Sequence, residues 1–321
     1  MNPFAHHKSY NRMYKEGELT LGLHIPLENY QFDTPTMEKQ VELAQLSEKL
    51  GFTSLWFRDV LLEDPNFGDP AVGQIYDMMI YLTYLASQTK DIALGTAAAV
   101  LPLRHPLRVA KEIATIDQLF PGRVLLGVSS GDRRADFAAM GASHPDRGQK
   151  FVEAYHYLQE ALYKEFPHIE SSRGNIRDAN LVPKPTTRIP TFITGYAQQD
   201  MKWFAEHGDG WMYYPRSPHD QEVTIQRWRS LVEEYHPGVF KPFSQPMHLD
   251  LDLAEDPNEI PRPIRLGFRI GRNYLIELLN IYKQAGVNHL FFALFDSQRP
   301  ADEVIQELGE EVVPYFPAVQ G

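Results

Sequence analysis

The sequence predicts an α/β fold, a (β/α)8 barrel in which each strand is followed by a helix. Short apolar runs typical of buried strands alternate with segments whose apolar residues recur at helical spacing, and eight such units fit into 321 residues. The rival arrangement is an open, doubly wound sheet. Its glycine-rich fingerprint is missing, because the first strand runs through His24 into IPLENY without G-x-G-x-x-G. We therefore expect one barrel domain over residues 1–321.

The strands and helices follow one another in a regular order. The expected strands lie at 19–25, 54–57, 92–98, 123–128, 190–194, 211–214, 247–253 and 289–295. The expected helices lie at 35–50, 75–88, 109–119, 151–162, 201–207, 228–235, 275–282 and 304–312. Thr34 followed by Pro35 predicts the start of the first helix, and Gly51 predicts its end. The seventh strand rests on the alternation of apolar with polar residues over 247–252.

Two connections are longer than ordinary barrel loops. They are expected as insertions near 163–189 and 236–272, the second rich in proline. The first is expected to decorate the outside of the barrel. For the second, decoration and a role as a lid or dimer contact remain equally open.

Composition excludes several classes of protein. The net charge is −11 without a basic tract, which disfavours a nucleic-acid partner. The chain has no cysteine and no H-x-H pair, so neither a disulfide framework nor a metal-dependent barrel hydrolase is expected, and no metal site is predicted. No apolar run reaches the length of a membrane span, and the first residues lack the apolar core of a signal peptide. We expect a cytoplasmic protein that does not bind membranes.

In a barrel of this type the chemistry belongs at the carboxyl ends of the strands. Two of the loops there contain small residues that can surround a phosphate: the Ser129-Ser130-Gly131 turn and the Gly195-to-Gln198 loop, which runs towards a helix N-terminus. From the residues alone, such turns are more often plain turns than phosphate sites.

Two long stretches resemble the bacterial luciferase-like flavin oxidoreductases. Residues 94–141 contain GTA at the end of a strand, RHP at the start of a helix, and GR-x-x-x-G before a Ser/Gly loop. Residues 180–211 contain P-x-P, a strand that ends in glycine, a helix and DGW. The resemblance covers roughly residues 19–215. It implies a barrel that binds FMN, with the deazaflavin F420 as the alternative cofactor.

The resemblance also implies which residues surround the cofactor. In such proteins the FMN phosphate lies between the loops after strands four and five, often with an arginine, and small residues at the end of strand three lie against the flavin ring. The cofactor-binding residues expected on this basis are Thr96, Ala97, Ala98, Ser129, Ser130, Gly131, Arg147, Thr194, Gly195, Tyr196, Ala197 and Gln198.

Two of these expectations have a purely structural alternative. Arg147 would suit a phosphate, and it would equally suit an ion pair with Asp146 or Glu153. The resemblance further implies a cis peptide at Ala97–Ala98, or one residue to either side. The alternative there is that alanine fills a tight layer inside the barrel.

The candidates for catalysis are His24 and Asp59. Many relatives carry Glu-His-His after the second strand, but here Asp59 is followed by Val60, which puts light emission in doubt. Asp59 would hydrogen-bond a polar edge of the flavin or form an ion pair with Arg58. His24 is a candidate acid/base by its position at a strand end, with a structural role as the alternative.

The leading hypothesis is an FMN-dependent monooxygenase that uses reduced flavin and O2 on a small organic substrate. The alternatives are an F420-dependent hydride-transfer enzyme and a non-catalytic flavin-binding protein. A flavin reductase is the candidate partner that supplies reduced FMN, and by analogy we expect a homodimer or higher homo-oligomer.

Overall fold

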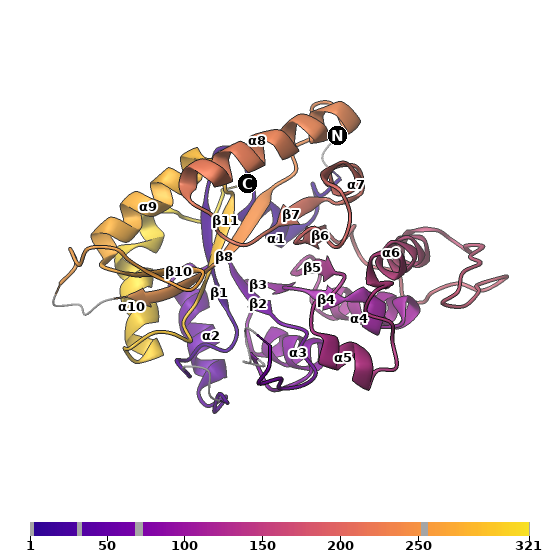
Figure 1. The fold of residues 1–321 in the computed structure, drawn as a ribbon, viewed down its shortest axis with the longest axis horizontal. Helices are drawn as coiled ribbons and strands as arrows, with labels where there is room; N and C mark the ends of the chain where they lie inside the picture. The colour runs from indigo at the N-terminus through magenta and orange to yellow at the C-terminus, as the bar shows by residue number, and fades with distance from the viewer. Residues whose placement is uncertain (1–2, 31–33, 68–72, 252–255, 321) are drawn as a thin grey trace.

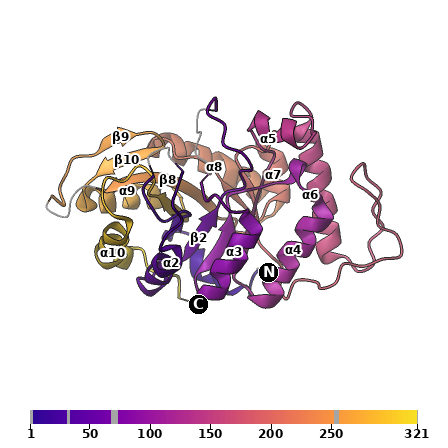
Figure 2. The same ribbon diagram turned by 90° about the horizontal axis from the view of Figure 1, so that it is seen from below.

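Eight parallel strands close into a barrel, as predicted (Figure 1). The computed structural model describes residues 3–30, 34–67, 73–251 and 256–320. Within this part of the chain the barrel order is β11-β1-β2-β3-β5-β6-β7-β8, and the pairing of β8 with β11 closes it. Helices lie around the outside, and Figure 2 shows α2, α3 and α4 side by side.

The barrel strands are short and mostly buried. They are β1 (Thr20–His24), β2 (Ser54–Phe57), β3 (Ala93–Thr96), β5 (Val124–Ser129), β6 (Thr191–Thr194), β7 (Gly210–Met212), β8 (Phe243–Leu251) and β11 (His289–Ala293). A two-residue strand, β4 (Ala99–Val100), pairs with β5. The helices are α1 (Lys8–Met13), α2 (Gln40–Lys49), α3 (Met78–Gln88), α4 (Pro106–Leu119), α5 (Arg134–Ala139), α6 (Arg147–Tyr163), α7 (Met201–His207), α8 (Pro218–Tyr235), α9 (Arg272–Gln284) and α10 (Ala301–Glu311). Two 3-10 turns lie at Leu101–Leu103 and Val313–Tyr315.

The first outer helix begins later than the sequence predicts. Helix α2 starts at Gln40 rather than at Pro35, because the Glu28 carboxylate accepts hydrogen bonds from Met37 N and Thr36 Oγ1 and holds this stretch as a turn. Helix α3 likewise starts at Met78, where the carboxylate of its N-cap residue accepts from the amide of Ile80.

Large side chains fill the interior of the barrel. Trp56, Phe192 and Phe291 are buried on the inner face and pack together with the N-terminal segment. Gly95 makes room for this packing, because a Cβ atom there would lie 2.3 Å from the Trp56 ring. The interior is therefore a packed core, and the amino and carboxyl ends of the barrel are separated by it.

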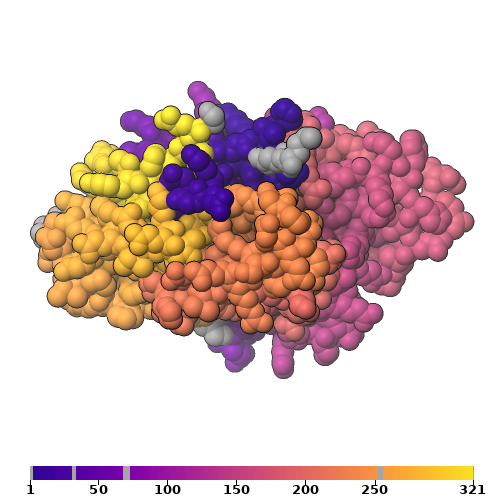
Figure 3. All heavy atoms as spheres, turned by 90° about the horizontal axis from the view of Figure 1, so that it is seen from above, coloured from indigo at the N-terminus to yellow at the C-terminus, as the bar shows by residue number. Residues whose placement is uncertain are grey.

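The N-terminal segment closes the amino end of the barrel, which the sequence did not indicate. Phe4, Tyr10 and Tyr14 are buried against the inner aromatic residues, and the Tyr14 hydroxyl lies 3.1 Å from Ser244 Oγ on β8. In the space-filling view the first residues (indigo) lie beside the C-terminal segment (yellow), where Val319 N donates to Arg12 O (Figure 3).

The second predicted insertion contains the predicted seventh strand and two extra strands. Barrel strand β8 begins at Phe243, inside the 236–272 stretch, because Pro242 and Pro246 obscure the strand pattern without ending the strand. The last residues of the predicted seventh strand, 252 and 253, lie outside the described part of the chain. Beyond β8, strands β9 (Arg262–Ile264) and β10 (Gly267–Ile270) form a hairpin, and β10 pairs with the carboxyl half of β8.

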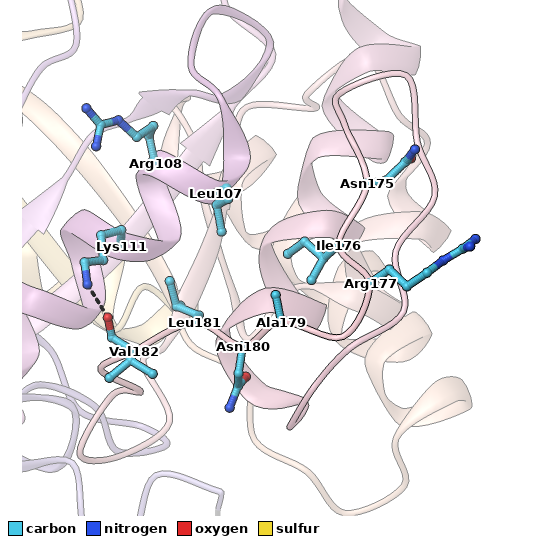
Figure 4. Close-up of a pocket in the computed structure, with 10 residues that line it drawn as sticks. All are labelled: Leu107, Arg108, Lys111, Asn175, Ile176, Arg177, Ala179, Asn180, Leu181 and Val182. Atoms are coloured by element: carbon cyan, nitrogen blue, oxygen red, sulfur yellow. Dashed lines mark hydrogen bonds between the residues drawn. The ribbon is translucent and has the colours of Figure 1, made fainter.

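The first long connection lies outside the barrel, as expected for decoration. Residues 175–182 pack beside α4 and form the wall of a cavity of about 490 Å³ (Figure 4). Leu107, Ile176 and Leu181 point into this cavity, and Lys111 donates to Val182 O. It is a groove in the outer layer, away from the ends of the strands. Among the described residues, no helix is both long enough and apolar enough to cross a membrane.

Candidate functional site

The loop after β5 contains a hydroxyl group without a hydrogen-bond partner among the described residues. Ser129 ends the strand, and the hydroxyl of the largely buried Ser130 makes no hydrogen bond within the described residues. Gly131 has a φ of +76°, and a Cβ atom there would lie 2.6 Å from Val100 Cγ1, so that only glycine fits. The Ser130 hydroxyl is thus held beside a tight turn and is available to a ligand.

The loop after β6 presents free amides. Gly195 is held in place, since its N–H donates to Met212 O and its carbonyl accepts from Trp211 Nε1. Ala197 and Gln198 both adopt left-handed conformations, with φ of +49° and +60°, and their N–H groups have no partner in the described part of the chain. Non-glycine residues are held in this way at a cost, and such outliers gather at functional sites.

Two other residues of this predicted set have ordinary surroundings. Thr194 ends β6 with its hydroxyl 3.9 Å from Met212 Sδ, and the ring of Tyr196 lies at the rim, edge to face with Tyr213 at 5.3 Å. The predicted helix N-terminus contributes less than expected. Asp200 caps α7 by accepting from the amide of the third helical residue, so the open amides belong to the loop itself.

Arg147 is the first residue of α6 and is not part of an ion pair. Its Nη1 donates to His144 O at 3.0 Å, whereas its Nε is buried without a hydrogen-bond partner. The alternative of an ion pair with Asp146 or Glu153 is wrong, because Glu153 accepts from Ser172 instead. A half-buried guanidinium whose Nε is buried and unused matches a planar or tetrahedral anion.

The start of α6 and the loop after β6 are in direct contact. Gln199 Nε2 donates to Gly148 O at 2.9 Å, and a Cβ atom at Gly148 would lie 2.8 Å from Gln198 Cβ. The loop after β5 joins the same cluster through Phe137, whose ring contacts the glycine of that loop and packs against His144. The structure therefore brings together predicted residues from three separate segments.

This cluster is locally positive in a chain of net negative charge. Burial lowers the pKa of His144, and the neighbouring Arg147 and Arg134 lower it further. A cation at a helix N-terminus is also unfavourable, because the helix dipole is positive there. The positive charge of Arg147 at the start of α6 therefore lowers the stability of the fold unless an anion is bound beside it.

The end of β3 has the backbone geometry that the sequence predicts. A cis peptide joins Ala97 and Ala98. Thr96 Oγ1 donates to Gly127 O at 2.7 Å, and Ala97 N donates to Phe57 O at 2.7 Å, so neighbouring strands hold this segment on both sides. Ala98 is largely buried and Ala97 half-buried, at the carboxyl end of the barrel.

Asp59 is committed to a structural contact. Both of its oxygens accept from Arg104, at 2.7 and 2.8 Å, and Oδ2 also accepts from Val100 N. The predicted pair with Arg58 is wrong, and the fork with Arg104 leaves Asp59 poorly placed to bond a flavin edge. This pair could not be predicted from the sequence, because the partners are 45 residues apart.

His24 lies at the expected strand end with a perturbed pKa. Its half-buried ring stacks on Phe291 with ring centroids 6.0 Å apart. Burial lowers its pKa to about 3, and the nearby Arg58 and His248 lower it further. His24 is therefore neutral near pH 7, so that one ring nitrogen can donate a hydrogen bond and the other can accept one.

A second histidine, which is not among the residues predicted from the sequence, lies near His24. His248 is on the inner face of β8, and its Nδ1 lies 3.4 Å from Asp296 Oδ2, just after β11. Farther along the strand, Asp250 lies 3.5 Å from Arg269 Nη1. The alternation over 247–252 was the available signal, because it places these polar residues opposite the apolar face that packs under the helices.

The fold and this cluster at the carboxyl ends are those of a barrel oxidoreductase of the luciferase type. The chain belongs to the luciferase-like monooxygenase family, which it matches over residues 20–244. Members of this family of oxidoreductases use FMN or F420.

Individual relatives are distant. The chain is 24% identical over 208 residues to the alkanal monooxygenase alpha chain of Photorhabdus luminescens, which covers 63% of this chain and 55% of that protein. The chain thus spans little more than half the length of this curated relative. An F420-dependent secondary alcohol dehydrogenase in complex with an F420-acetone adduct has a TM-score of 0.76 at 20% identity and covers 95% of this chain and 100% of that one.

A further solved structure carries FMN. The oxygenating constituent of 3,6-diketocamphane monooxygenase from Pseudomonas putida, in complex with FMN, has a TM-score of 0.73 at 14% identity, covering 92% of this chain and 98% of that chain. At these identities both structures establish the barrel fold alone.

Proposed function

We propose that this chain is an FMN-dependent oxidoreductase, a monooxygenase that uses reduced flavin and O2 on a small organic substrate. The observation that supports this most is the buried, unpaired Nε of Arg147, the first residue of a helix whose second residue, Gly148, contacts the loop after β6. In the loop after β6, the left-handed residues Ala197 and Gln198 have free backbone amides, and in the loop after β5 Ser130 has a free hydroxyl. Together these donors suit a phosphate group.

The residues present fit FMN, and each has a separate task. Arg147, Ser130 and the amides of Ala197 and Gln198 would hold the phosphate, and the small residues at Ala97 and Ala98 would lie against the ring. When bound, reduced FMN supplies two electrons and two protons, one oxygen atom of O2 enters the substrate, and the other leaves as water. Because the interior of the barrel is packed and the N-terminal segment closes its amino end, the reactants would meet at the carboxyl end, where water would be excluded.

F420 remains the second candidate cofactor. It shares with FMN a phosphate on its side chain, so the donors described above suit both. The likeness to the F420-dependent secondary alcohol dehydrogenase favours hydride transfer in the same barrel. A non-catalytic flavin-binding protein is the third hypothesis, and a flavin reductase remains the candidate source of reduced FMN.

The test is to purify the protein, record its visible spectrum, and titrate the cofactor-free protein with FMN, FAD, riboflavin and F420. We expect FMN to bind more tightly than riboflavin, because only FMN carries the phosphate. Oxygen uptake would then be followed with a flavin reductase, NADH and a panel of aldehydes and ketones. Tight FMN binding without substrate-dependent oxygen uptake would favour the storage protein, and preference for F420 would favour hydride transfer.

A further inference from the structure

His248 lies at the point where β8 leaves the barrel. Its backbone pairs with Ala293 of β11 on one side and with Gly267 of β10 on the other. His248 N donates to Leu266 O at 3.0 Å, and a Cβ atom at Gly267 would lie 1.8 Å from His248 O. The hairpin of β9 and β10 can approach so closely only because residue 267 is glycine, and it fixes the backbone of His248.

The His248 ring has one nitrogen beside a carboxylate and one nitrogen free. Nδ1 lies 3.4 Å from Asp296 Oδ2, and the edge of the ring packs on Phe295 with centroids 4.3 Å apart. Nε2 has no hydrogen-bond partner among the described residues, although the residue is only 9% exposed. A carboxylate behind one nitrogen orients an imidazole and leaves the other to exchange a proton.

The strand order places this ring across the barrel from the end of β3, where the small residues would lie against the flavin ring. In the closed order, β8 lies opposite β3, β11 opposite β5 and β1 opposite β6. Ala293 of β11 pairs with His248 of β8. The last pair between β11 and β1 is Phe292 with Leu23, so the next residues, Ala293 and His24, lie at the same level. The two histidines are therefore two strands apart, roughly 10 Å between Cα atoms, with a small side chain between them.

The other charged groups around His248 are already engaged or differently placed. Asp250 pairs with Arg269 of β10 and accepts from Gln298 N. On β1, His24 is neutral, and Arg58 follows β2. Asp296, after β11, is the carboxylate nearest the His248 ring.

We propose that His248 exchanges a proton, through Nε2, with a carbonyl or hydroxyl oxygen of the substrate, and that Asp296 is its positioning residue. The role rests on the proposed function, which supplies the electrons and the oxygen atom; His248 only takes up and returns a proton. Both residues lie beyond residue 244, where the match to the family ends.

The first test needs no cofactor. Diethyl pyrocarbonate modifies accessible, unprotonated histidine nitrogens, and mass spectrometry of the treated protein identifies the sites. We expect His248 to be modified and the fully buried His289 to resist. An unmodified His248, in a sample where exposed His219 reacts, would overturn the proposal because Nε2 would not be free.

The second test uses the FMN-loaded protein with a panel of aldehyde, ketone and secondary alcohol probes. We expect His248→Asn to lower kcat by roughly 10²-fold or more and to abolish one limb of the pH profile, with FMN affinity within about threefold of wild type. Asp296→Asn should lower kcat roughly tenfold and displace that limb. His219→Asn, on the exposed face of α8, is the matched control.

Rescue separates chemistry from structure. Added imidazole should restore part of the turnover of His248→Ala while leaving its melting temperature unchanged. An unaltered pH profile in His248→Asn, or FMN binding without turnover of any probe, would overturn the proposal. Failure to bind either FMN or F420 would refute the proposed function instead, and the modification experiment would still decide whether Nε2 is free.

Discussion

Replacing Arg147 by alanine provides the sharpest test of the phosphate site. In the structure the guanidinium makes one hydrogen bond, to His144 O, and its buried Nε has none. A hydrogen bond that involves a charged group contributes roughly 1.5–3 kcal/mol. Loss of the Arg147 contact to a phosphate should therefore raise the Kd for FMN roughly 10- to 150-fold, at about 1.4 kcal/mol per factor of ten.

The same substitution should leave folding almost unchanged. Removing the bond to His144 O costs about 1 kcal/mol, and removing a cation from the first turn of α6 returns about 0.3–1 kcal/mol. The free energy of unfolding of Arg147→Ala should then lie within about 1 kcal/mol of the wild-type value. Arg227→Ala, which removes an exposed arginine from α8, is the matched control and should change neither quantity.

The assay compares the Kd values of two proteins, each for two ligands. Fluorescence titration would give the Kd of wild type and Arg147→Ala for FMN and for riboflavin, which lacks the phosphate. We expect the variant to weaken FMN binding and leave riboflavin binding within about twofold. Equal weakening of both ligands would show that Arg147 acts on the fold of the loop, and an unchanged FMN affinity would refute the assignment.

Three further predictions concern the barrel and its surface. Burial lowers the pKa of His289 to about 3 from 6.5 in the unfolded chain, so the free energy of unfolding should fall by up to about 1.4 kcal/mol per pH unit as the pH drops from 6.5 towards 3. Urea unfolding at several pH values should show that this free energy depends less steeply on pH in His289→Gln than in wild type. Equal pH dependence in the two proteins would contradict this prediction. Gly95→Ala would place a Cβ atom 2.3 Å from the Trp56 ring and should destabilise by roughly 1–3 kcal/mol or more, measured by thermal unfolding; a wild-type Tm would show that the ring can move aside. Ile80 is 73% exposed on α3, a helix without charged residues, so Ile80→Glu should convert the expected homodimer to a monomer in light scattering; a monomeric wild type would remove the basis for it.

The sequence predicted the barrel because its signals are local. In each strand or helix the apolar residues recur with a period of two or about 3.6, which is visible within a few residues. Eight alternating strands and helices are compatible with few other folds. The errors lie where a side chain overrides the local pattern. Glu28 delays the start of α2, and Pro246 hides the first residues of β8, whose later residues the alternation over 247–252 does predict.

The parts that could not be predicted depend on contacts between distant residues. The N-terminal segment, which gave no strand or helix signal, closes the barrel because Tyr14 meets Ser244, 230 residues away. Asp59 was expected to bond a flavin edge or to pair with Arg58, its neighbour, and instead binds Arg104. A single sequence does not determine such pairings, whereas the loops proposed to hold a phosphate could be named because their residues are clustered along the chain.

The candidate site is built from two parts of the chain. Residues 20–244, which match the family, contain the proposed phosphate donors, the loops after β5 and β6 and the end of β3. The opposite wall, built from the carboxyl half of β8, the β9–β10 hairpin and the segment after β11, lies beyond that region. It holds His248, Asp296 and the Asp250–Arg269 pair. Because the cofactor would be held from one side and the substrate would meet the other, we expect substitutions in 248–296 to change which substrate is turned over without changing FMN affinity. Exchanging the β9–β10 hairpin for that of a relative tests this, and a loss of FMN binding in the chimaera would contradict the division.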